Sequence, residues 1–176
     1  YIGKPDSIQV FSGRNRVVLQ WLITSDPKVT AAKVYWDNKT KERKIDFKKG
    51  AGVDTVRTVI DGLSQGYHSF EVYTMDNEGN RSISVYVSGM VYGENYEKSL
   101  SNRSVESFKY EIGGSSLVNW LVADSSSIGL KLRYKKVNDE EITLIVKNEE
   151  SISSLIDHDI SSQISYQTMY RPNSLS

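Results

Sequence analysis

The sequence of 176 residues predicts an all-β fold with two tandem β-sandwiches. The first reason is a repeat: a strand that carries a Trp is followed by an aromatic-tipped strand and later by a Tyr-rich alternating strand. The first copy comprises residues 17–21, 32–36 and 67–74, and the second copy comprises residues 117–120, 130–134 and 164–170. The second reason is that apolar and polar residues alternate within these segments, as they do in half-buried strands. A long repeat built from strands indicates two sandwich domains rather than one enzyme fold.

About seven strands are predicted in roughly the first ninety residues, which is the number in a small sandwich. Alternation in the second strand places Leu19 and Trp21 on the core face, and in the third it places Trp36 inward and Tyr35 outward. Segment 43–47 is rich in charged residues, which protect an edge strand from pairing with other chains. The predicted strands are residues 6–11, 16–24, 32–36, 43–47, 55–60, 70–74 and 82–87, and residues 76–80 form a hairpin turn.

The second copy shows the same pattern over fewer strands. Its predicted strands lie at residues 108–112, 117–122, 128–134, 142–146, around 152–156 and at 164–170. In the third of these, Ile128, Leu130, Leu132 and Tyr134 are expected to point into the core. The residues after Tyr170 contain no convincing last strand, so we expect this sandwich to be truncated at its C-terminal strand.

The change in pattern between the copies predicts the domain boundaries. Residues 89–103 break the alternation with Gly, Asn, Tyr and Ser. We therefore predict a first sandwich over residues 1–90, an interdomain segment over 91–103, and a second sandwich over 104–176.

Composition excludes several classes of function. The chain has 22 basic and 22 acidic residues, and this zero net charge argues against a nucleic-acid partner. It has no cysteine, which removes disulfides, thiolate metal sites and cysteine nucleophiles from consideration. It also has no apolar run long enough to span a bilayer.

The first copy resembles a fibronectin type III domain. The resemblance rests on Trp21 in the second strand, Leu63 before a turn, the alternating Phe70 and Val72, and Glu78-Gly79-Asn80 before the last strand. Ser69 stands where that family usually has a Tyr at the start of the sixth strand, so the family's tyrosine-corner hydrogen bond is not carried over. The resemblance implies an immunoglobulin-like β-sandwich for each copy.

Nearly the whole chain also resembles a domain-of-unknown-function family of Bacteroidota surface lipoproteins. The similar segments are residues 73–82, 91–93 with Tyr96, and 166–172. The resemblance implies export to the extracellular face of the outer membrane, with a lipid anchor on a Cys outside these residues. It also implies a carbohydrate-associated domain on the C-terminal side and no assigned catalytic residues.

Aromatic side chains are the candidates for ligand contact. Trp21, Trp36 and Trp120 lie on apolar faces of their strands, so core packing explains them. Tyrosines expected on the solvent side could stack on a sugar ring, although exposed Tyr is also common through cross-strand pairing. The candidate glycan contacts are Tyr35, Tyr73, Tyr86 and Tyr170.

No catalytic, cofactor or metal site is predicted. His68 and His158 are the only histidines and fall in different copies, and Asp76-Asn77-Glu78-Gly79-Asn80 lacks the distal Glu of a calcium loop. The sequence contains no Gly-x-Ser-x-Gly elbow and no phosphate-binding loop. The basic run Lys39 to Lys49 is interrupted by Glu42 and Asp46, and protection of an edge strand explains it better than anion binding.

Three functions are therefore open, none of them enzymatic and none requiring a cofactor. The favoured one is a cell-surface spacer and interaction module that positions a further C-terminal domain, linked to glycan use or adhesion. The alternatives are a carbohydrate-binding module that uses the four tyrosines, and a protein-partner module of a surface complex that uses an exposed sheet edge. A glycan or a surface protein is the expected partner, the membrane is reached only through the lipid anchor, and the chain is expected to be a monomer.

Overall fold

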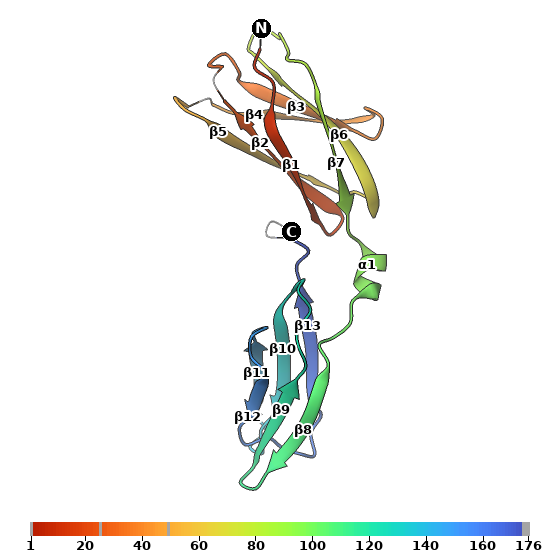
Figure 1. Cartoon of the computed structure of the whole chain (residues 1–176), viewed down its shortest axis with the longest axis vertical. Helices are drawn as coiled ribbons and strands as arrows, with labels where there is room; N and C mark the ends of the chain where they lie inside the picture. Colours follow the sequence, from red (N-terminus) through yellow and green to blue (C-terminus); the bar gives the residue numbers. More distant parts are fainter. Residues whose placement is uncertain (1, 25, 49, 174–176) are drawn as a thin grey trace. The chain divides into compact units, whose positions relative to one another are not determined.

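The computed structural model describes residues 2–24, 26–48 and 50–173, and these residues form two compact β-sandwich units (Figure 1). Unit 1 comprises the described residues up to Glu97 together with Asn173, and unit 2 comprises Lys98–Pro172. The boundary between the units therefore follows Glu97, inside the segment 91–103 predicted to join them. Each unit has its own core of buried apolar side chains.

Unit 1 is a sandwich of a three-stranded and a four-stranded antiparallel sheet. The first sheet has the order β1-β2-β5, and the second has the order β4-β3-β6-β7 (Figure 1). Its strands are β1 (Asp6–Gly13), β2 (Arg16–Ile23), β3 (Ala31–Trp36), β4 (Lys41–Asp46), β5 (Asp54–Asp61), β6 (Gly66–Met75) and β7 (Val85–Val91). The charged segment around Arg43 is an edge strand, as its sequence predicts.

The core of unit 1 is built from the alternate positions that the sequence places inward. Leu19 and Trp21 of β2 are fully buried, and Trp36 of β3 is nearly so. They pack with Val34, Phe70 and Val72 of the opposite sheet in one cluster. Burying a large apolar side chain contributes about 1.5–3 kcal/mol, so these positions hold the two sheets together.

Two features near the end of unit 1 differ from the prediction. β7 begins at Val85 and continues to Val91, because Val91 packs into the core with no exposed surface. The residues that follow form a short helix, α1 (Glu94–Ser99), where only an irregular segment is predicted. Its acidic first turn includes Glu97, which forms an ion pair with Arg14 at 2.6 Å. Carboxylates in a first helical turn favour helix formation through the helix dipole.

Unit 2 has six described strands in two three-stranded sheets. The sheet orders are β12-β9-β8 and β11-β10-β13 (Figure 1). The strands are β8 (Val105–Glu111), β9 (Ser115–Trp120), β10 (Ser127–Lys135), β11 (Glu141–Val146), β12 (Ile152–Leu155) and β13 (Ser165–Tyr170). Trp120 lies in the second strand of unit 2 as Trp21 does in unit 1, so the sequence repeat is a repeat of structure.

The core of unit 2 is smaller and includes polar anchors. Leu130, Leu132 and Leu155 are fully buried, and the Trp120 indole donates a 2.9 Å hydrogen bond to the Ser153 hydroxyl. Tyr166 packs edge-on against Trp120 with ring centroids 5.0 Å apart. A buried indole N–H with a partner avoids the cost of an unsatisfied donor.

One predicted core residue of unit 2 is exposed. The register between β10 and β13 shifts between Ser127 and Gly129, where the backbone forms a bulge. Gly129 adopts φ +126°, which L side chains rarely reach. The bulge turns Ile128 out of the inward series, and its side chain is 47% exposed.

Candidate functional site

Three of the four candidate tyrosines lie on the outer face of the four-stranded sheet of unit 1. The register places Tyr35 of β3 opposite Glu71 of β6, and Glu71 opposite Tyr86 of β7. Tyr73 follows two positions along β6 and therefore has the same orientation. We call the set Lys33, Tyr35, Glu71, Tyr73 and Tyr86 the aromatic face.

Tyr73 is not exposed, which corrects its assignment as a glycan contact. Alternation places it outward, yet only 6% of its surface is accessible. The Tyr35 ring lies against it with centroids 6.0 Å apart, and the Arg81 guanidinium lies 5.6 Å above the ring. This burial raises the pKa of the Tyr73 hydroxyl above its ordinary value.

The other tyrosines differ in their exposure. Tyr35 is half-buried, with the Lys33 ammonium 5.1 Å above its ring. Tyr86 is 69% exposed and is the only wholly accessible ring of the aromatic face. Tyr170 belongs to unit 2, where it is half-buried and donates a hydrogen bond to the Ser101 carbonyl at 2.5 Å. The aromatic face therefore has no pair of accessible, parallel rings.

Glu71 is the electrostatic centre of the aromatic face. Its carboxylate is 9% exposed, pairs with the Lys39 ammonium at 2.6 Å, and accepts a 2.7 Å hydrogen bond from the Ser84 hydroxyl. The Lys39 ammonium, followed by Ser84, lowers the pKa of Glu71 below its ordinary value of 4.5. The same pair raises the pKa of Lys39. Both groups are therefore charged at neutral pH.

A second ion pair completes the aromatic face. The Lys33 ammonium lies 2.8 Å from the Glu42 carboxylate. Its hydrogen bond to Glu42 raises the pKa of Lys33 and lowers that of Glu42. The charges of the aromatic face are thus matched within the sheet, and none of these carboxylates has the raised pKa expected of a general acid.

The basic run on and around β4 pairs in the same way. Lys41 pairs with Asp37 at 3.0 Å, and Lys44 pairs with Asp46 at 2.8 Å. Arg43 reaches Asp61 at 3.4 Å. Lys49 lies outside the described residues. Local pairing of this kind supports the edge-strand interpretation of the run.

The two histidines occupy unrelated places. His68 of unit 1 has its Nε2 2.8 Å from the Ser64 carbonyl oxygen. His158 of unit 2 is 3% exposed, sits edge-on to the rings of Phe108 and Tyr134, and has its Nδ1 2.8 Å from the Ser116 hydroxyl. Over the described ranges, no group of three or more His, Cys, Asp and Glu side chains is arranged to hold a metal ion.

The loop after β6 is a hairpin turn closed by Asp76. Its carboxylate accepts backbone hydrogen bonds from Glu78 and Asn80, both at 2.9 Å, and one from the Asn80 side chain at 2.8 Å. These bonds, led by the Asn80 side chain, lower the pKa of Asp76. The Asp76 oxygens are therefore used by the turn itself.

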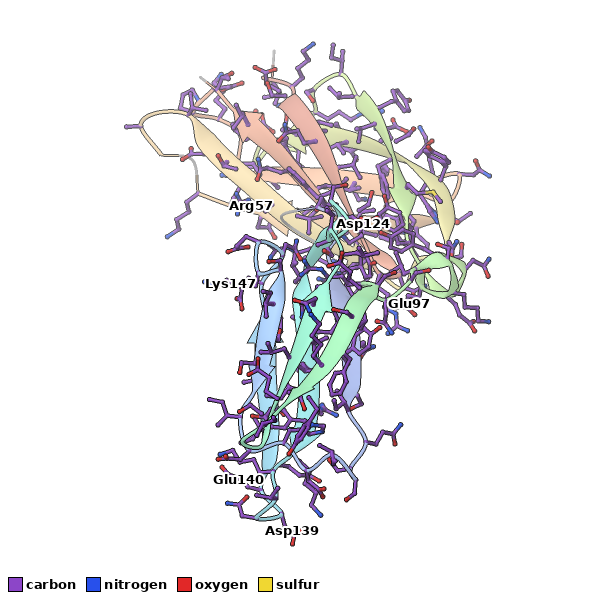
Figure 2. The ribbon with its side chains drawn as sticks, turned by 60° about the horizontal axis from the view of Figure 1, so that its bottom comes forward. Arg57, Glu97, Asp124, Asp139, Glu140 and Lys147 are labelled. Carbon is purple, nitrogen blue, oxygen red and sulfur yellow. The ribbon has the colours of Figure 1, made fainter. Side chains whose placement is uncertain are left out.

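Sequence reasoning missed one feature of unit 2. Phe108 and Tyr110 of β8 are predicted on a strand, but they are 48% and 52% exposed although they lie on the core side of their sheet. The only signal in the sequence is the absence of a strand after Tyr170. Figure 2 shows side chains along the whole of unit 2, with Asp139 and Glu140 labelled in the turn between β10 and β11.

Comparison with solved structures finds tandem fibronectin type III domains. A two-domain segment of chicken tenascin matches with 11% identity and a TM-score of 0.38, covering 96% of this chain and 99% of that chain. The first three fibronectin domains of chicken CNTN1 match with 14% identity and a TM-score of 0.44, covering 98% of this chain and 62% of that chain.

Curated protein sequences contain no match to this chain. Within the described ranges, no helix has the length and apolar character needed to cross a membrane. The sequence matches DUF4998, a domain of unknown function, over residues 1–176. The chain, a pair of fibronectin type III-like sandwiches, therefore belongs to the DUF4998 family.

Proposed function

We propose that this chain is a non-catalytic cell-surface module that spaces a neighbouring domain from its anchor and offers contact surface to a partner. The observation that carries the proposal is the pair of separate cores, one in each unit. Each unit is an antiparallel sandwich, an architecture shared by many cell-surface domains. Its large aromatic residues Trp21, Trp36 and Trp120 are used for packing and not for contact.

The lack of free chemistry on the aromatic face supports a non-catalytic role. Glu71 and Glu42 are both held as carboxylates by lysines at 2.6 Å and 2.8 Å. A hydrolase that uses two carboxyl groups needs one of them protonated near neutral pH, which requires a raised pKa. The lowered pKa values of this pair favour a structural role for both carboxylates.

The spacer role can be tested by pulling the chain between its ends in a force spectrometer. We expect two force peaks, because each unit unfolds around its own core. The extended lengths are about 350 Å for the residues up to Glu97 and about 270 Å for Lys98–Pro172, at up to 3.6 Å per residue. A single gradual extension without peaks would show that the chain cannot resist load and would contradict the spacer role.

Direct carbohydrate binding is the second candidate, supported by the exposed ring of Tyr86 beside half-buried Tyr35. A glycan array probed with the chain and with Tyr86→Ala tests it. The proposed spacer and contact role predicts no saturable glycan signal. Saturable binding that Tyr86→Ala removes, and that Tyr67→Ala at the far end of β6 retains, would replace that role with glycan recognition.

A further inference from the structure

The two units share one strand order up to their last strand. In unit 1 the sheets are β1-β2-β5 and β4-β3-β6-β7, and in unit 2 they are β8-β9-β12 and β11-β10-β13. β8 thus corresponds to β1 and β13 corresponds to β6. Among the described strands, none of unit 2 takes the position that β7 has in unit 1.

β7 has two structural roles in unit 1. It pairs with β6, with Val87 directly opposite buried Phe70. It also covers β1: a Cβ built on Gly89 would lie 2.9 Å from Val10 Cβ, and closer still to Val10 Cγ1. Val10 and Val87 both pack against the core as a result. The seventh strand therefore closes the edge of one sheet and covers the first strand of the other.

In unit 2 the strand equivalent to β1 is left uncovered. Phe108 lies opposite Val118, and Tyr110 lies opposite Ser116, so both side chains point to the core side of their sheet. Val118 and Ser116 are buried, whereas Phe108 and Tyr110 are about half exposed. Figures 1 and 2 both place β8 and β13 along the same side of unit 2.

β13 is the edge strand of the second sheet. The Thr168 N–H donates to the Asn102 side-chain oxygen at 2.8 Å, so the backbone groups of Thr168 point away from β10. Because these directions alternate along a strand, the N–H and C=O of Tyr166 also point away from β10. Within the described ranges, neither group of Tyr166 has a hydrogen-bond partner. We call Phe108, Tyr110 and the outward backbone of Tyr166 and Thr168 the open edge.

We propose that the open edge binds an extended strand of a separate polypeptide, which adds antiparallel to β13 in the position that β7 has in unit 1. The proposal rests on the proposed function as a contact module and identifies its contact site. Strand addition supplies main-chain hydrogen bonds, and alternate side chains supply specificity. The partner segment is expected to have apolar residues at alternate positions, as β7 has in Val85, Val87 and Val91.

The partner is not a second copy of this chain, because every described strand already belongs to a sheet. A copy could pair only edge to edge through β13, and this would leave Phe108 and Tyr110 uncovered. A separate extended segment satisfies the edge backbone and covers the two aromatic rings together. Burying them contributes to affinity in proportion to the apolar area removed from water.

The test uses the whole chain and a synthetic peptide with the sequence of residues 84–92, the β7 strand of unit 1. Binding is followed by NMR titration and by amide hydrogen exchange. We expect saturable binding, with shifts at β8 and β13 and exchange of the Tyr166 amide slowed by about tenfold or more. A peptide with Val87→Pro loses one strand hydrogen bond and is expected to bind more weakly.

Two variants on neighbouring residues of β8 separate the open edge from general surface effects. Tyr110→Glu places a charge at the open edge and is expected to weaken binding by about tenfold or more, or 1.4 kcal/mol. Lys109→Glu changes the opposite face of the same strand and is expected to change affinity less than about twofold. Circular dichroism and thermal unfolding of both variants confirm that unit 2 remains folded.

Three outcomes would overturn the proposal: no saturation by the peptide, equal binding by the two variants, or shifts confined to the edge strand β4. Concentration-dependent dimers that Tyr110→Glu abolishes would also overturn it, because they would identify a second copy as the occupant. None of these results depends on the force peaks or the glycan array. Failure of the open edge is therefore distinguishable from failure of the spacer and contact role.

Discussion

At the scale of single residues, Glu71 shows how burial and pairing determine the charge state of the aromatic face. The carboxylate is 9% exposed, whereas the side chain of its partner Lys39 is 61% exposed. Burial alone would raise the pKa of a carboxyl group. The ammonium at 2.6 Å and the Ser84 hydroxyl at 2.7 Å outweigh burial, and the pKa is lowered instead.

Glu71→Gln is expected to lower the free energy of unfolding of unit 1 by about 1–2 kcal/mol at pH 7, since hydrogen bonds to charged groups contribute about that much. A folded-state pKa below the unfolded value means that the contribution is present above pH 4.5 and is lost as the pH falls through the folded pKa. The difference between wild type and variant should therefore shrink below about pH 4. Urea unfolding at pH 7 and pH 3.5 measures it.

The exposed pair of Lys33 and Glu42 provides the control for this prediction. Glu42 is 51% exposed in its side chain, so Glu42→Gln is expected to change stability by less than about 1 kcal/mol. Equal losses for Glu42→Gln and Glu71→Gln would show that burial of the Glu71 carboxylate does not matter.

Gly89 is a second residue whose identity is determined by a close approach. A side chain there would meet Val10 of β1, so Gly89→Val forces the two sheets apart at that point. Overpacking of this kind costs about 1–3 kcal/mol. Thermal unfolding should show this loss for Gly89→Val and little change for Gly52→Ala, whose added Cβ would meet no atom within 4 Å. Val10→Ala should restore part of the stability, and no rescue would contradict the assigned contact.

At the scale of elements, the bulge in β10 determines which residues of that strand face the core. Alternation predicts that Ile128 and Leu130 share a face, but the extra residue opposite β13 separates them. Ile128 is 47% exposed while Leu130 is fully buried. The φ of +126° at Gly129 makes this arrangement possible.

Gly129→Ala is expected to destabilise unit 2 by more than Gly113→Ala. Both glycines have positive φ, and a non-Gly residue in such a conformation costs about 1–3 kcal/mol. A Cβ on Gly129 would also lie 2.7 Å from the Val146 carbonyl oxygen, whereas a Cβ on Gly113 would meet nothing within 4 Å. Chemical denaturation of the two variants isolates the contact with β11. Equal losses would contradict a role for that contact.

At the scale of the whole molecule, each unit packs around its own apolar cluster. Leu19 belongs to the cluster of unit 1, and Leu132 belongs to the cluster of unit 2; both are fully buried. Core stability is therefore expected to be a property of each unit.

Leu19→Ala and Leu132→Ala are expected to destabilise different units. A buried Leu→Ala change costs about 2–5 kcal/mol in the unit that contains it. Hydrogen exchange followed by mass spectrometry should show faster exchange in β2, β3 and β6 for Leu19→Ala, and in β9, β10 and β13 for Leu132→Ala. Acceleration of both units by either change would contradict separate cores.

The sequence by itself determined the strands, the duplicated Trp positions and the two cores. Alternation with a period of two is a local property, so Trp21, Trp36 and Trp120 could be placed inward without knowing any neighbour. The edge position of Arg43 was also readable, because its charges follow the strand directly.

Only the tertiary structure decided which outward residues are covered and which inward residues are not. Tyr73 points outward and is nevertheless buried, because Tyr35 and Arg81 lie over it. Phe108 points inward and is nevertheless half exposed, because no described strand lies opposite β8. Coverage depends on which strand is placed across the sandwich, and strands that are neighbours in space are distant in sequence. Local alternation contains no record of that pairing.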